Sequence, residues 1–342
     1  MKEIKNKDKK SFLKNIFIKI CRFLGFEIID QSKAYIPTMG ISINENTNIL
    51  GKKSINLPLG EVKISRKVKS LDIIIRTCME VQMLTQNKKR VFEKHKSEYS
   101  LRTVNSIIQS YKHSKNLKNL EVKFTVIDHN SEKENLSRLH DLFRKNNLKF
   151  KLINLEISNF KNAINKINEK KLTVTDNQIS NMSNIHQSLI EAKNCNDLVY
   201  FIEDDYLHSL DCLEEMIFAY ERISSQLDKE IFMLPADYPY LYSKFENTVI
   251  LLGKKYHWRK VNESLCSMLT SKKMIEKHWL QLKGMCEFEH YPFEKPLHKI
   301  FEKEFCFSPI PSLSFHCTNI NSIFGLSPNI DWKKIWDENK IN

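Results

Sequence analysis

Glycine is scarce in this chain of 342 residues. There are seven glycines, and none lies between Gly60 and Gly253. A phosphate-binding loop of the P-loop or dinucleotide-binding type needs several glycines directly after an early strand. The sequence therefore excludes such a loop. A bound nucleotide diphosphate would have to be neutralised by a metal ion or by basic side chains.

Paired cysteines and long apolar runs are also missing. The eight cysteines are scattered and include no CxxC pair, which excludes zinc-ribbon spacing. We expect free thiols in a reducing compartment, because a disulfide scaffold is unusual in a chain of this length. No run approaches the roughly 18 apolar residues of a membrane span, so the sequence predicts no membrane-spanning helix.

The composition is that of a globular protein with a basic surface. Hydrophobic residues make up 41% and charged residues 28% of the chain, enough to build a buried core. The net charge is +13, with lysine spread along the whole chain. No recognisable nucleic-acid-binding module accompanies this charge, so we do not expect a nucleic-acid partner.

The amino-terminal 30 residues predict a basic amphipathic helix. Apolar residues recur at helical spacing from Phe12 to Leu24, and Lys14, Lys19 and Arg22 fall on other faces. These charges interrupt the apolar run that a signal peptide requires. Such a helix favours an anionic membrane surface, here the cytoplasmic face, although it could instead dock on the protein's own core. Residues 31–69, rich in proline and glycine, are predicted to be a connector.

From residue 70 onwards, predicted strands alternate with predicted helices, which indicates an α/β domain with a mainly parallel sheet. We assign the domain to residues 70–335 and a tail to 336–342. The strands are predicted at 71–76, 122–127, 150–155, 198–202, 231–234 and 248–252, and the helices at 101–111, 136–143, 182–192, 213–223, near 272–282 and near 296–305.

Polar residues follow three of the predicted parallel strands. Because the carboxyl ends of these strands meet at one edge, where α/β sheets bind ligands, we expect the polar residues to lie together. Three consecutive carboxylates after a buried strand repel one another unless a cation neutralises them, and Mg²⁺ or Mn²⁺ suits oxygen ligands beside a phosphate. The alternative is a solvated acidic strand end. The residues are Arg76, Thr77, Asp128, Glu203, Asp204 and Asp205.

Six segments resemble those of GT-A glycosyltransferases of the family-2-like type, in the same order along residues 70–332. DLVYFIEDDYLH at 197–208 is similar to their metal-binding strand end. The others are LDIIIRT at 71–77, FTVIDHNS at 124–131, SNIHQSLIEA at 183–192, YHWRKVNESLCSML at 256–269 and SLSFHC at 312–317. The chain departs from the family at Ile185 and His186, where an Arg-Asn pair is usual, which leaves the sugar contact of His186 in doubt.

The resemblance implies a GT-A-like fold and metal-dependent transfer of a hexose, with inversion, from a nucleotide diphosphate donor. The acceptor would be a hydroxyl of a glycan or lipid-linked saccharide, as in cell-surface polysaccharide synthesis. The implied metal ligands are Glu203, Asp204, Asp205 and His316, and the implied nucleotide contacts are Arg76, Thr77, Asp128 and Asp204. Candidates for the acceptor or sugar site are His186, Asp237, Trp258 and Arg259.

The catalytic base is predicted in GMCEFEHYP, before the last predicted helix of the domain. Glu287 and Glu289 alternate with apolar residues, so an extended backbone would point both the same way, and we favour Glu289. Each of these candidates also has a purely structural interpretation. The two glutamates would then be surface acids, His316 and Trp258 would pack in the core, Asp237 would lie in a turn, and Arg76 would pair with Asp128.

Two other functions fit parts of the pattern. A nucleotidyltransferase uses a related sheet and an acidic metal site, but it relies on a glycine-rich basic loop that RTCMEV at 76–81 does not provide. A non-catalytic adaptor on the membrane surface would keep the fold without the chemistry. Nucleotide binding distinguishes the enzyme from the adaptor.

Overall fold

The computed structural model describes residues 12–26, 62, 64–80, 90–243, 248–317 and 330–341. The predicted connector lies almost entirely outside these residues. The chain divides into two compact units, Met1–Val62 and Lys63–Asn342, and each is described by itself.

The first unit contains the predicted amino-terminal helix, α1, at Phe12–Phe23. Apolar side chains of this helix and of the turn after it are exposed, including Phe17, Ile20, Phe23 and Leu24. Lys19 is exposed as well. In the described part of the chain, no helix combines the length and the apolar character needed to cross a bilayer.

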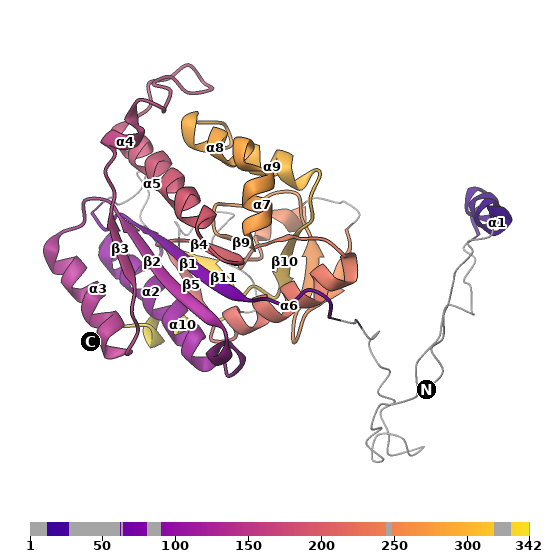
Figure 1. The fold of residues 1–342 in the computed structure, drawn as a ribbon, viewed down its shortest axis with the longest axis horizontal. Helices are drawn as coiled ribbons and strands as arrows, with labels where there is room; N and C mark the ends of the chain where they lie inside the picture. Colours follow the sequence, from indigo (N-terminus) through magenta and orange to yellow (C-terminus); the bar gives the residue numbers. More distant parts are fainter. Residues whose placement is uncertain are drawn as a thin grey trace, which may run out of the picture. The chain divides into compact units, whose positions relative to one another are not determined.

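The second unit is built around a nine-stranded sheet with the order β3-β2-β1-β4-β9-β6-β10-β8-β7 (Figure 1). β3, β2, β1 and β4 are parallel neighbours, whereas β9 and β8 pair antiparallel with the strands beside them. The predicted mainly parallel α/β fold is confirmed. The strands are β1 Ser70–Thr77, β2 Glu121–Asp128, β3 Lys151–Asn154, β4 Leu198–Glu203, β6 Phe232–Met233, β7 Ile250–Leu252, β8 His257–Lys260, β9 Met268–Ser271 and β10 Cys306–Ile310.

Helices cover both faces of the sheet. In Figure 1, α4, α5, α7, α8 and α9 lie on one side and α2, α3, α6 and α10 on the other. β1 and β4 are almost completely buried between these layers, which explains their largely apolar sequences. The helices are α2 Lys96–His113, α3 Lys133–Lys145, α4 Ser158–Lys161, α5 Asp176–Lys193, α6 Cys212–Leu227, α7 Lys272–Lys277, α8 Trp279–Glu287, α9 Lys295–Phe301 and α10 Trp332–Glu338, with 3-10 turns at η3 Asn116–Asn119 and η4 Pro239–Ser243.

The second unit extends beyond both predicted boundaries of the domain. At its start, Arg66 donates hydrogen bonds to Asp197 and Glu230, which ties the chain to the sheet before β1 begins. At its end, the ring of Trp336 stacks on Phe92 with a centroid distance of 4.2 Å and is 4% exposed. The segment predicted as a tail is therefore part of the packed structure.

A separate two-stranded sheet joins distant parts of the chain. β5 Tyr206–His208 pairs antiparallel with β11 Ser314–His316, and His316 lies opposite Tyr206. The two rings stack with a centroid distance of 4.7 Å. This pairing places His316 directly beside the acidic residues at the end of β4.

Candidate functional site

The polar ends of β1, β2 and β4 meet at one edge of the sheet, as predicted. The register pairs Thr77 with Asp128 across β1 and β2, and Arg76 with Glu203 across β1 and β4. The hydroxyl of Thr77 donates to Asp128 Oδ1 at 2.7 Å, and the hydroxyl of Ser131 donates to the same oxygen at 2.6 Å. These bonds fix the orientation of the Asp128 carboxylate, which is 3% exposed.

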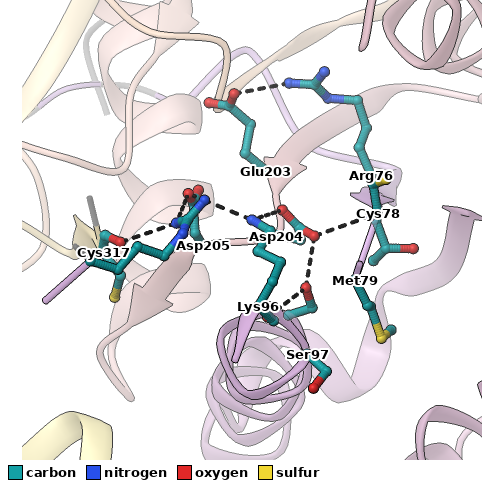
Figure 2. A network of polar contacts seen from close by, with 12 residues as sticks. Arg76, Cys78, Met79, Lys96, Ser97, Glu203, Asp204, Asp205 and Cys317 are labelled. Atoms are coloured by element: carbon teal, nitrogen blue, oxygen red, sulfur yellow. Dashed lines mark hydrogen bonds and ion pairs between the residues drawn. The ribbon is translucent and has the colours of Figure 1, made fainter. Parts of the chain in front are cut away.

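Glu203 is neutralised by an arginine from the neighbouring strand. Its Oε1 lies 3.1 Å from Arg76 Nη2 (Figure 2). Arg76 also donates from Nη1 to Asn181 Oδ1 at 2.9 Å. Arg76 is 7% exposed, so a nearby carboxylate is required to stabilise its charge. The ion pair therefore forms with Glu203 rather than with Asp128, the partner proposed from the sequence.

Asp204 is bound to the first turn of α2 (Figure 2). Lys96 Nζ donates to its Oδ1 at 2.6 Å. Its Oδ2 accepts from the hydroxyl of Ser100 at 2.7 Å and from the backbone N–H of Cys78 at 3.2 Å. Both oxygens of Asp204 are thus engaged by protein donors.

Asp205 lies between two cations and a histidine. Its Oδ2 accepts from Arg90 Nη1 at 2.7 Å and lies 3.7 Å from Lys96 Nζ, while its Oδ1 lies 3.3 Å from His316 Nε2. Burial alone would raise the pKa of Asp205, but Lys96, His316 and Arg90 outweigh it and hold this pKa well below its usual value. In turn, burial lowers the pKa of His316, but Asp205 more than offsets this effect and raises it.

Glu203, Asp204 and Asp205 are each paired with a protein cation in this arrangement. Within the ranges that the structure describes, no group of three or more His, Cys, Asp and Glu side chains is arranged to hold a metal ion. Both oxygens of Asp204 accept hydrogen bonds and Asp205 Oδ2 is bound to Arg90, whereas the buried Oε2 of Glu203 has no hydrogen-bond partner among the described residues. The metal ion stays a prediction. The expected neutralising cation is supplied by the protein itself, through Arg76, Lys96 and Arg90.

Two of these cations, Arg90 and Lys96, were not among the residues selected from the sequence. Lys96 is the first residue of α2. A positive charge at a helix N-terminus is unfavourable unless a carboxylate compensates it, so a lysine at a helix start is a signal that sequence reasoning can use. Arg90 follows residues 81–89, which lie outside the described part, and no local pattern distinguishes it.

The two predicted catalytic glutamates are engaged in local contacts. Glu289 is 6% exposed and accepts from Asn168 Nδ2 at 2.8 Å and from Gln178 Nε2. Glu287 forms an ion pair of 2.8 Å with Lys283, one turn earlier in α8. These contacts give Glu289 a role in joining the segment before α5 to the segment after α8. Whether either residue is the base stays a prediction.

Two of the four predicted acceptor residues pack in the interior. Trp258 is fully buried, and its Nε1 donates to Glu215 Oε1 at 3.1 Å. His186 lies between Phe160 and Trp279, with centroid distances of 5.0 and 6.5 Å, and burial lowers its pKa. Both side chains therefore pack in the core, as the structural interpretation of Trp258 predicted, and neither contact points to a sugar.

The other two acceptor candidates form a buried ion pair. Arg259 Nη2 donates to Asp237 Oδ1 at 2.7 Å, and the hydroxyl of Tyr242 donates to the other oxygen of Asp237. The guanidinium lies 4.2 Å from the centre of the Tyr242 ring. Burial raises the pKa of Asp237, and Tyr242 and Arg259 act against this rise. The pair fixes η4, whose role in acceptor binding stays a prediction.

Comparison with solved structures finds matches at low sequence identity. No protein-family model and no curated protein matches the chain. Among solved structures, the chain is similar to LgtC, a galactosyltransferase crystallised with donor and acceptor sugar analogues, at 11% identity over 78% of this chain and 94% of that one, with a TM-score of 0.39. The chain is also similar to mouse xyloside xylosyltransferase 1, at 10% identity over 68% of this chain and 76% of that one, with a TM-score of 0.35. Its similarity to S. aureus TarS has 15% identity over 61% of this chain and a TM-score of 0.34, and it spans 29% of TarS.

These similar structures include glycosyltransferases, the class that the sequence resemblance implies. The identities and TM-scores are too low to carry an argument about function. The function is therefore inferred from the residues of the site.

Proposed function

We propose that the protein transfers a sugar from a nucleotide diphosphate donor bound at the carboxyl ends of β1, β2 and β4. The observation that carries this proposal is the set of charged groups at this edge, where Arg76, Arg90, Lys96 and His316 are paired with the three carboxylates that follow β4, beside the oriented carboxylate of Asp128. In α/β sheets this edge is where ligands bind. Guanidinium, ammonium and imidazole N–H groups suit a diphosphate, and a fixed carboxylate suits a ribose hydroxyl or a base N–H.

In the proposed reaction, the oxygen of an acceptor hydroxyl forms a bond to the anomeric carbon of the donor sugar. The bond between that carbon and the diphosphate oxygen breaks, and its electron pair leaves on the diphosphate. Arg76 and His316 stabilise this developing charge, and a base takes the hydroxyl proton. The metal predicted from the sequence stays a prediction, and no step of this proposal passes through it.

We further propose that the acceptor is a glycan or lipid-linked saccharide reached from the cytoplasmic face of a membrane. What supports this is α1, whose exposed apolar residues and surrounding lysines suit an anionic lipid surface. A hexose donor and an inverting reaction remain part of the proposal. They rest on the sequence resemblance alone.

Titration calorimetry of the full chain with UDP, GDP and CDP tests the nucleotide site. We expect one of the three to bind, and Asp128→Asn to weaken it about 10- to 100-fold, because a charge-assisted hydrogen bond is lost. Asp141→Asn, in an exposed ion pair on α3, is the matched control and should keep the affinity. Because Glu203, Asp204 and Asp205 each have a cation already, we expect EDTA and Mn²⁺ to give affinities within about threefold of each other.

The other outcomes separate the rival functions. Binding of none of the three nucleotides would contradict the proposal and favour the adaptor. Binding only with Mn²⁺ would restore the metal-dependent mechanism predicted from the sequence. If the protein consumes a nucleoside triphosphate and releases pyrophosphate, it is a nucleotidyltransferase.

If a nucleoside diphosphate binds as proposed, a screen of nucleotide sugars, with nucleoside diphosphate release as the readout, identifies the donor.

A further inference from the structure

Glu294, the residue directly before α9, lies at the same edge of the sheet as the acidic cluster. Its Oε1 is 4.0 Å from Cys266 Sγ. The next residue, Ser267, accepts from the backbone N–H of Glu203 at 3.0 Å. The segment Cys266–Ser267 therefore joins Glu294 to the carboxyl end of β4, where the proposed donor site is.

Glu294 differs from the acids around it in having no counter-cation. Glu203, Asp204 and Asp205 each form an ion pair, whereas none of the described Lys, Arg or His side chains forms one with Glu294. The titratable and charged groups that act on Glu294 come from several elements around it. They are Glu203 of β4, His316 of β11, Arg76 of β1, Tyr238 and Tyr240 at η4, and Cys266 just before β9.

This environment suits proton transfer near neutral pH. Burial raises the pKa of Glu294 to about 7, although a hydrogen bond from its own backbone N–H acts against the rise. The negative charge of Glu203 adds to the rise, and His316 and Arg76 act against it. A general base works best when its pKa lies near the working pH. A carboxylate that is already bound by amide donors, such as Glu289, is less suited because proton uptake would disrupt those bonds.

We propose that Glu294 is the general base that takes the proton from the acceptor hydroxyl, an assignment that rests on the proposed sugar transfer. The acceptor O–H bond breaks and its proton goes to a carboxylate oxygen of Glu294. The acceptor oxygen bonds to the anomeric carbon, and the diphosphate leaves with the electron pair of the broken C–O bond. Glu294 then returns the proton to water.

The pH dependence of kcat/KM in the full chain tests this assignment. We expect the wild type to lose activity as the pH falls below about 7, because the base becomes protonated. Glu294→Gln should lower kcat by about 10²- to 10⁴-fold and remove this acid limb. Its affinity for the nucleoside diphosphate should stay within about twofold of the wild type, because Glu294 acts on the acceptor. Glu294→Asp should recover part of the rate.

Two further variants make the test specific. Glu302→Gln changes an exposed glutamate just after α9 and should behave as the wild type. Glu289→Gln should keep the acid limb, and a loss of that limb in Glu289→Gln alone would overturn the assignment of Glu294. The assignment also fails if Glu294→Gln keeps the wild-type rate and profile while the wild type is active. If the wild type neither binds a nucleotide nor releases one from any donor, the proposed function fails together with it.

Discussion

At the scale of single residues, Glu294 combines a proposed catalytic role with a cost in stability. Its pKa is 4.5 in the absence of the fold and about 7 in the folded protein. Below pH 4.5 the carboxyl is protonated in both the folded and the unfolded state, so the raised pKa does not lower the free energy of unfolding. Above about 7 it is ionised in both states, and the folded state then carries the full cost of at most about 3 kcal/mol.

Glu294→Gln should therefore raise the free energy of unfolding by at most about 3 kcal/mol at about pH 8, because it removes this cost. The gain should shrink as the pH is lowered from 7 towards 4.5, the window between the two pKa values. Urea unfolding of both proteins across this range measures it. A gain that is the same at every pH, or a loss at about pH 8, would contradict the raised pKa.

The acidic triplet shows how far sequence reasoning reaches at this scale. Three adjacent carboxylates after a buried strand require neutralisation, and the structure supplies it. Nothing local to Asp204 indicates that its cation is Lys96, which lies 108 residues away in the chain. The sequence thus predicted the electrostatic requirement but not the lysine and arginine that pair with these carboxylates, and the metal ion stays a prediction.

At the scale of elements, the hairpin of β7 and β8 depends on one glycine. A Cβ atom at Gly253 would lie 2.0 Å from Glu215 Oε1 and 2.5 Å from Trp258 Nε1. Neither neighbour is able to retreat easily. Glu215 accepts from the backbone N–H groups of Lys254 and Lys255 at 2.9 Å and from Trp258, and Trp258 is fully buried.

Gly253→Ala should lower the free energy of unfolding by about 1–3 kcal/mol, as expected for overpacking at a site that cannot adjust. Gly284→Ala is the matched control, because no atom lies within 4 Å of its Cβ position in α8. Alanine in a helix is favoured over glycine by about 0.5–1 kcal/mol, so this control should be neutral or stabilising. Equal effects of the two substitutions in thermal unfolding would show that space at Gly253 is not limiting.

The strands of the sheet divide into those that the sequence predicts and those that it does not. β1, β2 and β4 were predicted to within one residue at each end. β1 and β4 are mostly buried runs rich in β-branched, leucine and aromatic residues, and β2 has such residues in its buried second half. β5 and β11 have three residues each, too few to show a period, and they form only because distant segments pair. The place of His316 beside Asp205 follows from this pairing. From the sequence it was available only through the family resemblance.

At the scale of the whole molecule, the chain consists of two units that follow different physical rules. The second unit buries a continuous core between two helical layers, so its alternating pattern could be read from the sequence. The first and last residues of the second unit could not be predicted from the sequence, because Arg66 and Trp336 lie in segments of polar or mixed composition and are fixed by long-range contacts. The first unit contains α1, which has several exposed apolar side chains.

The proposed partner of α1 is an anionic membrane surface, and vesicle sedimentation of the full chain tests it. We expect binding to vesicles with acidic phospholipid, little binding to neutral vesicles, and weaker binding as the salt concentration rises. Phe17→Ser and Phe23→Ser should each weaken binding about 10-fold, because burial of a phenylalanine contributes about 1.5–3 kcal/mol. Leu280→Ser, which removes an exposed apolar residue of α8, should have no effect. If the phenylalanine variants instead lower the melting temperature and leave vesicle binding unchanged, α1 docks on the protein's own core, because only then does its apolar face contribute to folding stability.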